Sequence, residues 1–127
     1  MNFGHTFGHG FERAKNFSNK LNHGEAVLLG MLVASELSFN KKLLNIKDLI
    51  SIKKHYFNLK LPNNLKKIFK RKDINKIVHF MKKDKKNTSE KISLILLKKI
   101  GKVEKFEKTL MRSSEIKKFL NSIYYYF

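Results

Sequence analysis

Residues 22–34 read NHGEAVLLGMLVA, and this stretch decides the fold. Asn22 with Glu25 three positions later has the pattern of a capping box, in which the two side chains bond each other's backbone at a helix start. The run from Ala26 to Ala34 is apolar on every side, which is typical of a helix buried on most of its faces. We therefore predict a central helix that begins after Asn22.

The residues before this stretch repeat with a spacing of four. Three pairs or triplets carry the repeat: Phe3, Phe7 and Phe11; Gly4 and Gly8; His5 and His9. This spacing predicts a helix with three stripes within residues 2–17. Each glycine inside a helix costs about 1 kcal/mol relative to alanine. We expect a close backbone approach to another element or to a ligand to offset that cost.

Further elements follow from caps and patterning. We predict an amphipathic helix from the cap Asn45 to about Asn58, short helices at about 65–69 and 74–82, a β-hairpin from 92–97 and 103–106, and a last helix at about 115–125 capped by Ser113 or Ser114. The predicted fold class is mainly α, a helical bundle with a small β-hairpin, in one domain spanning residues 1–127.

The chain is strongly basic, with 28 Lys and Arg against 10 Asp and Glu and a net charge of +18. The whole excess lies in residues 41–127, and a basic excess of this size suggests a nucleic-acid partner, with Tyr124, Tyr125 and Tyr126 available to stack on bases. Only three of the 28 residues are Arg, the residue that clamps phosphate with two hydrogen bonds. We favour a solvated lysine surface and a packed aromatic end over that reading.

Cysteine is absent, which excludes disulfides, thiolate zinc clusters and a cysteine nucleophile. A metal would need nitrogen or oxygen ligands. The longest uncharged apolar segment, residues 26–35, is about half of what a membrane span requires, and no secretory signal is present. We expect a cytoplasmic protein.

Three of the five histidines lie in the first 23 residues: His5 and His9 on one predicted helix face and His23 in the first turn of the next helix. An antiparallel helix pair could bring them together. A catalytic zinc needs three protein ligands and an open position, and imidazoles with one carboxylate are a common set. Histidines four apart also occur in cores and turns, so a structural role stays open; His55 and His79 are interpreted as surface or core-edge residues.

Residues 2–9 read NFGHTFGH, Glu12 follows, and the HGEAV of residues 23–27 precedes Gly30-Met31. These motifs resemble the metal-binding signature of the 3-dehydroquinate synthases. Met81, the Asp-Lys-Lys of residues 84–86 and Ile100-Gly101 resemble the family's C-terminal pattern in the same order. The resemblance therefore spans essentially the whole chain and implies the C-terminal domain of the dehydroquinate synthase-like fold.

The resemblance implies a role for each matching residue. His5 and His23 correspond to zinc ligands; Asn2, His9, Lys85 and Lys86 correspond to substrate-binding residues; His9 and Lys85 have catalytic roles; and Glu25 is assigned more weakly to orienting a metal-bound histidine. The family's third ligand, a Glu, belongs to an N-terminal NAD-binding domain, which we expect to be absent from this chain. Glu12 is a weaker candidate for a substitute carboxylate.

The family reaction converts the phosphorylated sugar acid DAHP into 3-dehydroquinate in the shikimate pathway, on the way to aromatic amino acids. It eliminates phosphate and uses NAD+ and Zn2+, or another divalent ion such as Co2+. The resemblance implies a lyase that needs an N-terminal NAD-binding domain, supplied in cis or in trans. This chain alone is therefore expected to be inactive. The complete enzyme is expected to form a homodimer. The alternatives are another sugar phosphate cyclase and a basic nucleic-acid-binding module.

Overall fold

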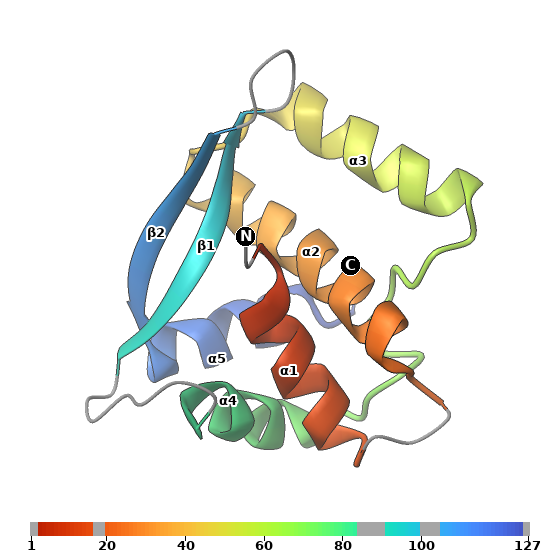
Figure 1. The fold of residues 1–127 in the computed structure, drawn as a ribbon, viewed down its shortest axis with the longest axis vertical. Coiled ribbons are helices and arrows are strands. Elements are labelled where there is room, and N and C mark those ends of the chain that lie inside the picture. The colour runs from red at the N-terminus through yellow and green to blue at the C-terminus, as the bar shows by residue number, and fades with distance from the viewer. Residues whose placement is uncertain (1–2, 17–19, 84–90, 100–104, 126–127) are drawn as a thin grey trace.

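The computed structural model describes residues 3–16, 20–83, 91–99 and 105–125. These residues form five helices and one antiparallel pair of strands (Figure 1). In chain order they are α1 (His5–Ala14), α2 (His23–Asn40), α3 (Ile46–Asn58), α4 (Asp73–Lys83), β1 (Lys91–Lys99), β2 (Lys105–Arg112) and α5 (Ser113–Ile123). The predicted mainly α fold with a small hairpin is confirmed.

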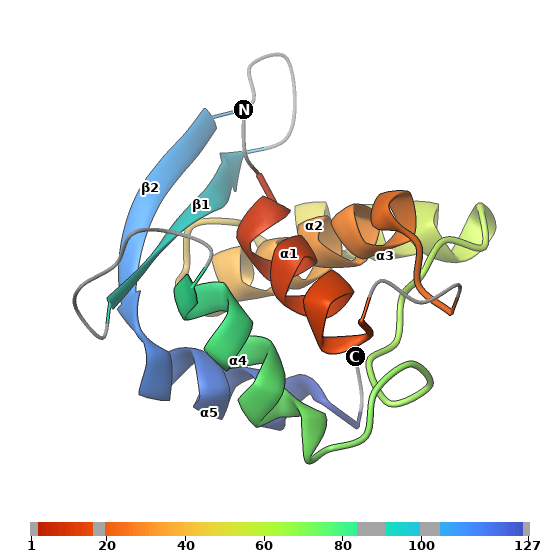
Figure 2. The ribbon, with the colours of Figure 1, turned by 60° about the horizontal axis from the view of Figure 1, so that its bottom comes forward.

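Helix α2 is the central element. Asn22 accepts a hydrogen bond from the backbone N–H of Glu25 at 2.8 Å, and the Glu25 carboxylate accepts one from the Asn22 N–H at 3.1 Å, so the predicted capping box is present. Helix α1, helix α3 and strand β1 all pack on α2, while α4 packs on α1 and on α5 (Figures 1 and 2). The apolar run of α2 is therefore in contact with neighbours on most sides, as its sequence predicts.

The expected close approach is between α1 and α2. A Cβ atom added at Gly30 would lie 2.7 Å from the Gly8 nitrogen and even nearer the Gly4 carbonyl oxygen. One added at Gly8 would lie 3.2 Å from the Ala26 oxygen. The two backbones therefore touch where their glycines meet. Gly4 itself precedes the helix, with a φ of +78°, so it is the helix cap and not an interior residue as the spacing suggested.

The hairpin covers one side of α2. In its register Ile92 pairs with Met111 and Leu94 with Thr109, and the side chain of Ile92 is fully buried. The hydroxyl of Ser38 on α2 accepts a hydrogen bond from the Leu97 N–H at 2.9 Å, which fixes β1 against the helix.

Two predicted elements differ from the structure. Residues 65–69 form a turn, in which the buried Leu65 and Phe69 imitate a helical spacing over a single turn. The last helix begins at Ser113, and neither serine caps it; Arg112 is at the cap position, and its N–H donates to the Glu115 carboxylate at 3.4 Å. The predicted second strand, 103–106, overlaps β2, which is described from Lys105 onward; residues 103 and 104 lie outside the described residues.

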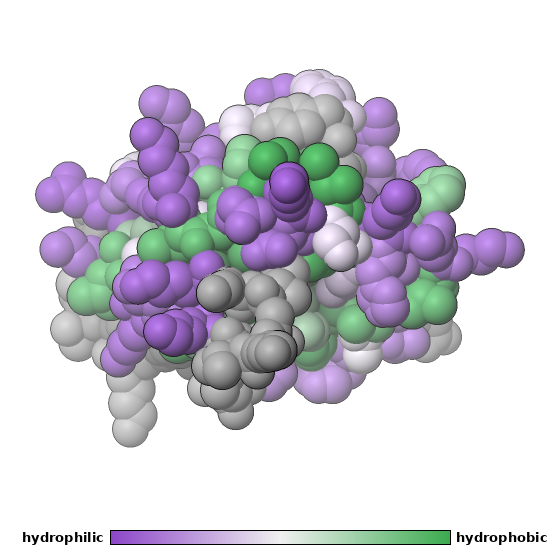
Figure 3. Space-filling model, turned by 90° about the horizontal axis from the view of Figure 1, so that it is seen from above, coloured by the Kyte–Doolittle hydropathy of each residue, from purple (hydrophilic) through white to green (hydrophobic). Residues whose placement is uncertain are grey.

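The aromatic end is packed at one of its two described tyrosines. Tyr124 is buried and donates its hydroxyl hydrogen bond to the Phe69 carbonyl at 2.6 Å, whereas Tyr125 is exposed under the Arg71 guanidinium; Tyr126 lies outside the described residues. Most described lysines are exposed, and Figure 3 shows one face where hydrophilic side chains surround apolar patches. Among the described residues, no helix combines the length and the apolar character needed to cross a membrane.

Candidate metal and substrate site

One face of α1 carries the candidate ligands. His5, His9 and Glu12 are spaced by four and then three residues, so they follow one another along that face. The rings of His5 and His9 are stacked, with centroids 6.0 Å apart and planes 7° from parallel. Both side chains are half-buried, which leaves this face partly open to solvent.

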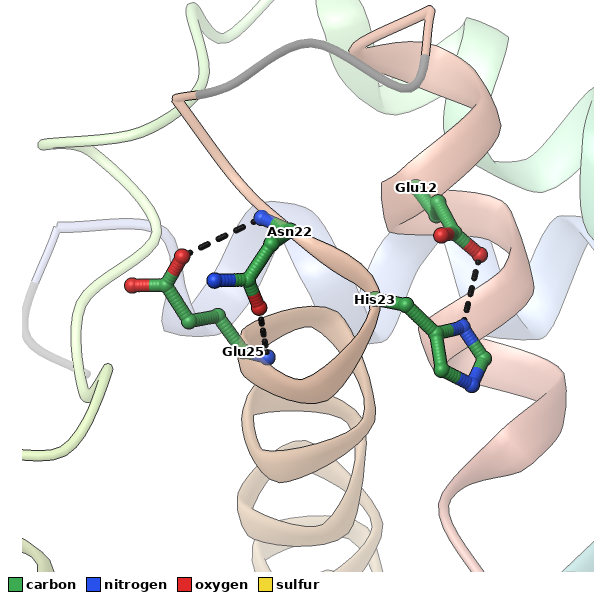
Figure 4. Close-up of polar contacts among 4 residues, drawn as sticks. All are labelled: Glu12, Asn22, His23 and Glu25. Atoms are coloured by element: carbon green, nitrogen blue, oxygen red, sulfur yellow. Dashed lines mark hydrogen bonds and ion pairs between the residues drawn. The ribbon is translucent and has the colours of Figure 1, made fainter.

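His23 reaches the same face from the first turn of α2. Its Nδ1 lies 3.1 Å from Oε1 of Glu12 (Figure 4). The His23 side chain is 67% exposed, whereas that of Glu12 is 14% exposed, so a nearly buried carboxylate contacts an accessible ring. The packing of α1 on α2 therefore brings His23 into contact with Glu12, which follows His5 and His9 on the same face of α1.

Glu25 lies on the opposite side of the helix start. Its carboxylate is engaged with the Asn22 N–H, and Figure 4 shows it directed away from the His23 ring. The carboxylate beside His23 is therefore Glu12, which sequence reasoning had considered only as a substitute ligand. The spacing of Glu12 from His9 and His5 along one helix face could have identified it.

The donors on this face suit zinc in type, since imidazole nitrogen is among its usual ligands. Within the described part of the chain, however, no three His, Asp or Glu side chains are grouped closely enough to hold a metal ion. The described residues therefore supply a partial ligand set at most. Binding of one ion by both His5 and His23 stays a prediction, and Asn2, Lys85 and Lys86 lie outside the described residues.

A separate hollow of about 420 Å³ lies between the start of α1, helices α2 and α3, and the hairpin. The described residues that line it are mostly apolar, including Phe3, Met31 and Phe106; they include His55 but no Lys, Arg, Asp or Glu. A phosphorylated sugar acid needs cationic partners. The described lining therefore offers no cationic group to the substrate that the resemblance implies.

The tyrosine beside this hollow has a structural role. Tyr56 donates a hydrogen bond to the Leu28 carbonyl at 2.7 Å, and burial raises the pKa of its phenol to about 12. It therefore stays protonated near neutral pH and ties α3 to α2. His55 and His79 are both exposed, in agreement with their interpretation as surface residues.

Comparison with known proteins gives the family. A family model described as "3-dehydroquinate synthase C-terminal" matches residues 1–87. The 3-dehydroquinate synthase of Pelagibacter ubique is 49% identical over 87% of this chain, and that of Nitrobacter hamburgensis is 38% identical over 80%. The matched parts amount to 31% and 28% of those enzymes, so the chain spans about a third of their length.

Solved structures agree. The fold matches a 2-deoxy-scyllo-inosose synthase that was crystallised with carbaglucose-6-phosphate, NAD+ and Co2+, with a TM-score of 0.68 and 27% identity over 95% of this chain and 32% of that one. Family model, relatives and fold thus agree with the motifs around His5 and His23: the chain belongs to the 3-dehydroquinate synthase family, of which it matches the C-terminal part.

Proposed function

We propose that this chain is the metal- and substrate-binding part of a 3-dehydroquinate synthase, which converts DAHP to 3-dehydroquinate with elimination of phosphate. The observation that carries the proposal is the α1–α2 pair, in which the family's two histidine motifs meet through a backbone contact and through the pair of His23 with Glu12. A relative at 49% identity that is named for this activity supports the same reaction.

Each motif residue has a task in this proposal. His5 and His23 hold the zinc or cobalt ion. When bound, the ion supplies a Lewis acid that polarises the hydroxyl being oxidised. Asn2 and His9 bind the substrate, and His9 also moves a proton. Lys85, with Lys86 as the second choice, neutralises the phosphate or carboxylate of the substrate.

The remaining parts come from outside this chain. The third metal ligand and the NAD+ site belong to the portion of the relatives that the chain does not span. We propose that this portion acts with the chain in cis or in trans, and that the complete enzyme is a homodimer. The absence of cysteine supports a cytoplasmic location.

A chimera tests the proposal. The matching third of the Pelagibacter ubique enzyme is replaced by this chain, and NAD-dependent phosphate release from DAHP is measured. We expect activity in the chimera and its loss, with the fold retained, in His5→Ala and His23→Ala. His55→Ala, which changes an exposed histidine on α3, is the matched control and should stay active. A folded chimera without activity, or one indifferent to His23, contradicts the proposal.

The second candidate is another sugar phosphate cyclase, which the fold match to 2-deoxy-scyllo-inosose synthase favours. Release of phosphate from glucose 6-phosphate in preference to DAHP would select it. The comparisons give no support to the nucleic-acid-binding alternative; oligonucleotide binding that weakens steeply with salt would revive it.

A further inference from the structure

We infer that Glu12 is a positioning residue, which holds Nδ1 of the His23 imidazole and leaves Nε2 for the metal ion. The inference rests on the proposed function, because it takes His23 to be a metal ligand. It assigns to Glu12 a task that neither the motif roles nor the comparisons give it.

The contact itself is the first argument. A carboxylate is only an acceptor, so the 3.1 Å contact with Nδ1 requires the hydrogen on that nitrogen. In a neutral ring the other nitrogen, Nε2, is then an unprotonated acceptor, the form in which imidazole binds a metal. Because the His23 side chain is 67% exposed, that nitrogen remains accessible.

The direction of the ring is the second argument. In Figure 4 the His23 ring lies beyond the Glu12 carboxylate, on the side of the preceding turns of α1. Those turns carry His9 and His5 on the same helix face, and three residues advance a helix by about 4.5 Å. Glu12 thus holds the exposed ring of His23 on the side of α1 from which the turns with His9 and His5 come.

Two alternatives fit the geometry less well. If Glu12 were a direct metal ligand, it would have to give up its contact with Nδ1 of His23. The described residues also contain no group of three metal-binding side chains that includes Glu12. Glu25 as the orienting carboxylate would have to release the Asn22 N–H and cross the start of α2. Carboxylates that orient metal-bound histidines are a common arrangement, and their removal costs about 10- to 100-fold in metal affinity.

The first measurement uses the metal-free 127-residue chain. Nitrogen-15 NMR, at a pH above which the His23 signals no longer change, reports which ring nitrogen of His23 carries the hydrogen. We expect the Nδ1–H form in the wild type and a shift toward the Nε2–H form in Glu12→Ala. Glu25→Gln is the matched control, since glutamine also completes a capping box, and it should leave the His23 spectrum unchanged.

The second measurement is the zinc affinity of the chimera described under the proposed function, which supplies the third ligand, by competition with a chromophoric chelator. We expect a loss of about 10- to 100-fold in Glu12→Ala, a smaller loss in Glu12→Gln, whose amide oxygen still accepts from Nδ1–H, and less than about 3-fold in Glu25→Gln. Melting curves confirm that the variants are folded. If Glu12→Ala unfolds and the other variants do not, Glu12→Gln decides the question. The inference then requires that Glu12→Gln lose more zinc affinity than Glu25→Gln.

The outcomes separate the inference from the function. Zinc binding that is lost in His23→Ala but unchanged in both Glu12 variants overturns the inference and leaves the proposed metal site standing. An Nε2–H tautomer in the wild type also overturns it. A chimera with the remaining part of the Pelagibacter ubique enzyme that binds no zinc at micromolar concentration, or binds it equally well in His5→Ala and His23→Ala, refutes the metal site and the inference together.

Discussion

Replacement of Gly30 by alanine tests the contact between α1 and α2. The new methyl group would lie 2.7 Å from the Gly8 nitrogen, 3.1 Å from the Gly8 Cα and closer still to the Gly4 oxygen. All three are backbone atoms, so no side chain can rotate away to make room. The Gly8 N–H also donates to the Gly4 carbonyl at 2.8 Å, and the methyl group would push on both partners of this hydrogen bond.

The cost can be worked from these contacts. Overpacking a tight interior contact costs about 1–3 kcal/mol, and the rigidity of the neighbours here favours the upper end of that range. Alanine returns about 1 kcal/mol through its better helix propensity. We therefore expect Gly30→Ala to lower the free energy of unfolding by about 2 kcal/mol, which at this chain length is a fall of roughly 8 °C in Tm.

Gly24→Ala is the matched control. A Cβ there would meet only the Asn22 Oδ1 at 3.5 Å, an ordinary van der Waals distance, so the change should be neutral or stabilise by up to about 1 kcal/mol. Urea and thermal unfolding followed by circular dichroism measure both variants. Equal stability of Gly30→Ala and the wild type would refute the reasoning, and so would an equal loss in both glycine variants.

Three further predictions concern single contacts. Asn22→Ala and Asn45→Ala each remove a helix cap whose side chain accepts a backbone N–H at 2.8 Å, so calorimetry should show a free energy of unfolding lower by about 1 kcal/mol in each. Zinc affinity should fall only in Asn22→Ala, because only that change loosens the turn that carries His23. Ser38→Ala leaves the buried N–H of Leu97 without its partner and should cost about 1–3 kcal/mol in urea unfolding; a cost near zero would mean that the hydroxyl does not anchor β1. Burial raises the pKa of Tyr56 to about 12, so the contribution of its protonated phenol to stability is intact below pH 10 and is lost between pH 10 and 12, by up to about 2 kcal/mol. In Tyr56→Phe the free energy of unfolding should therefore fall less steeply over that range. Identical pH profiles of the two proteins would contradict the assigned cause.

The elements with strong local patterns could be predicted from the sequence. The capping box at Asn22 and the apolar run after it located α2, because caps and periodicity act within a few residues. The turn at 65–69 was mistaken for a helix because Leu65 and Phe69 are buried by tertiary contacts that a local pattern cannot distinguish from a helical face. The start of α5 was missed by two residues because its first turn follows directly from β2.

The site was harder to predict than the fold. The histidine motifs identified the candidate ligands, but a motif does not say which carboxylate faces which ring. Glu25 adjoins His23 in sequence and yet points to the other side of the helix, whereas Glu12 is eleven residues away and contacts the ring. That pairing depends on the crossing of two helices, which no local pattern contains.

The glycines connect these observations. Glycine destabilises a helix relative to alanine, but Gly4, Gly8 and Gly30 offset that cost because they let the backbones of α1 and α2 come into contact. The same contact brings the first turn of α2 beside the third turn of α1. A wider crossing would carry Nδ1 of His23 out of hydrogen-bond range of Glu12, since the present separation of 3.1 Å has little margin. Gly30→Ala should therefore weaken zinc binding as well as stability, whereas Ser38→Ala, at the other end of α2, should lower stability and leave zinc affinity unchanged. Equal zinc affinity in Gly30→Ala and the wild type would show that the helix crossing does not set the geometry of the histidines.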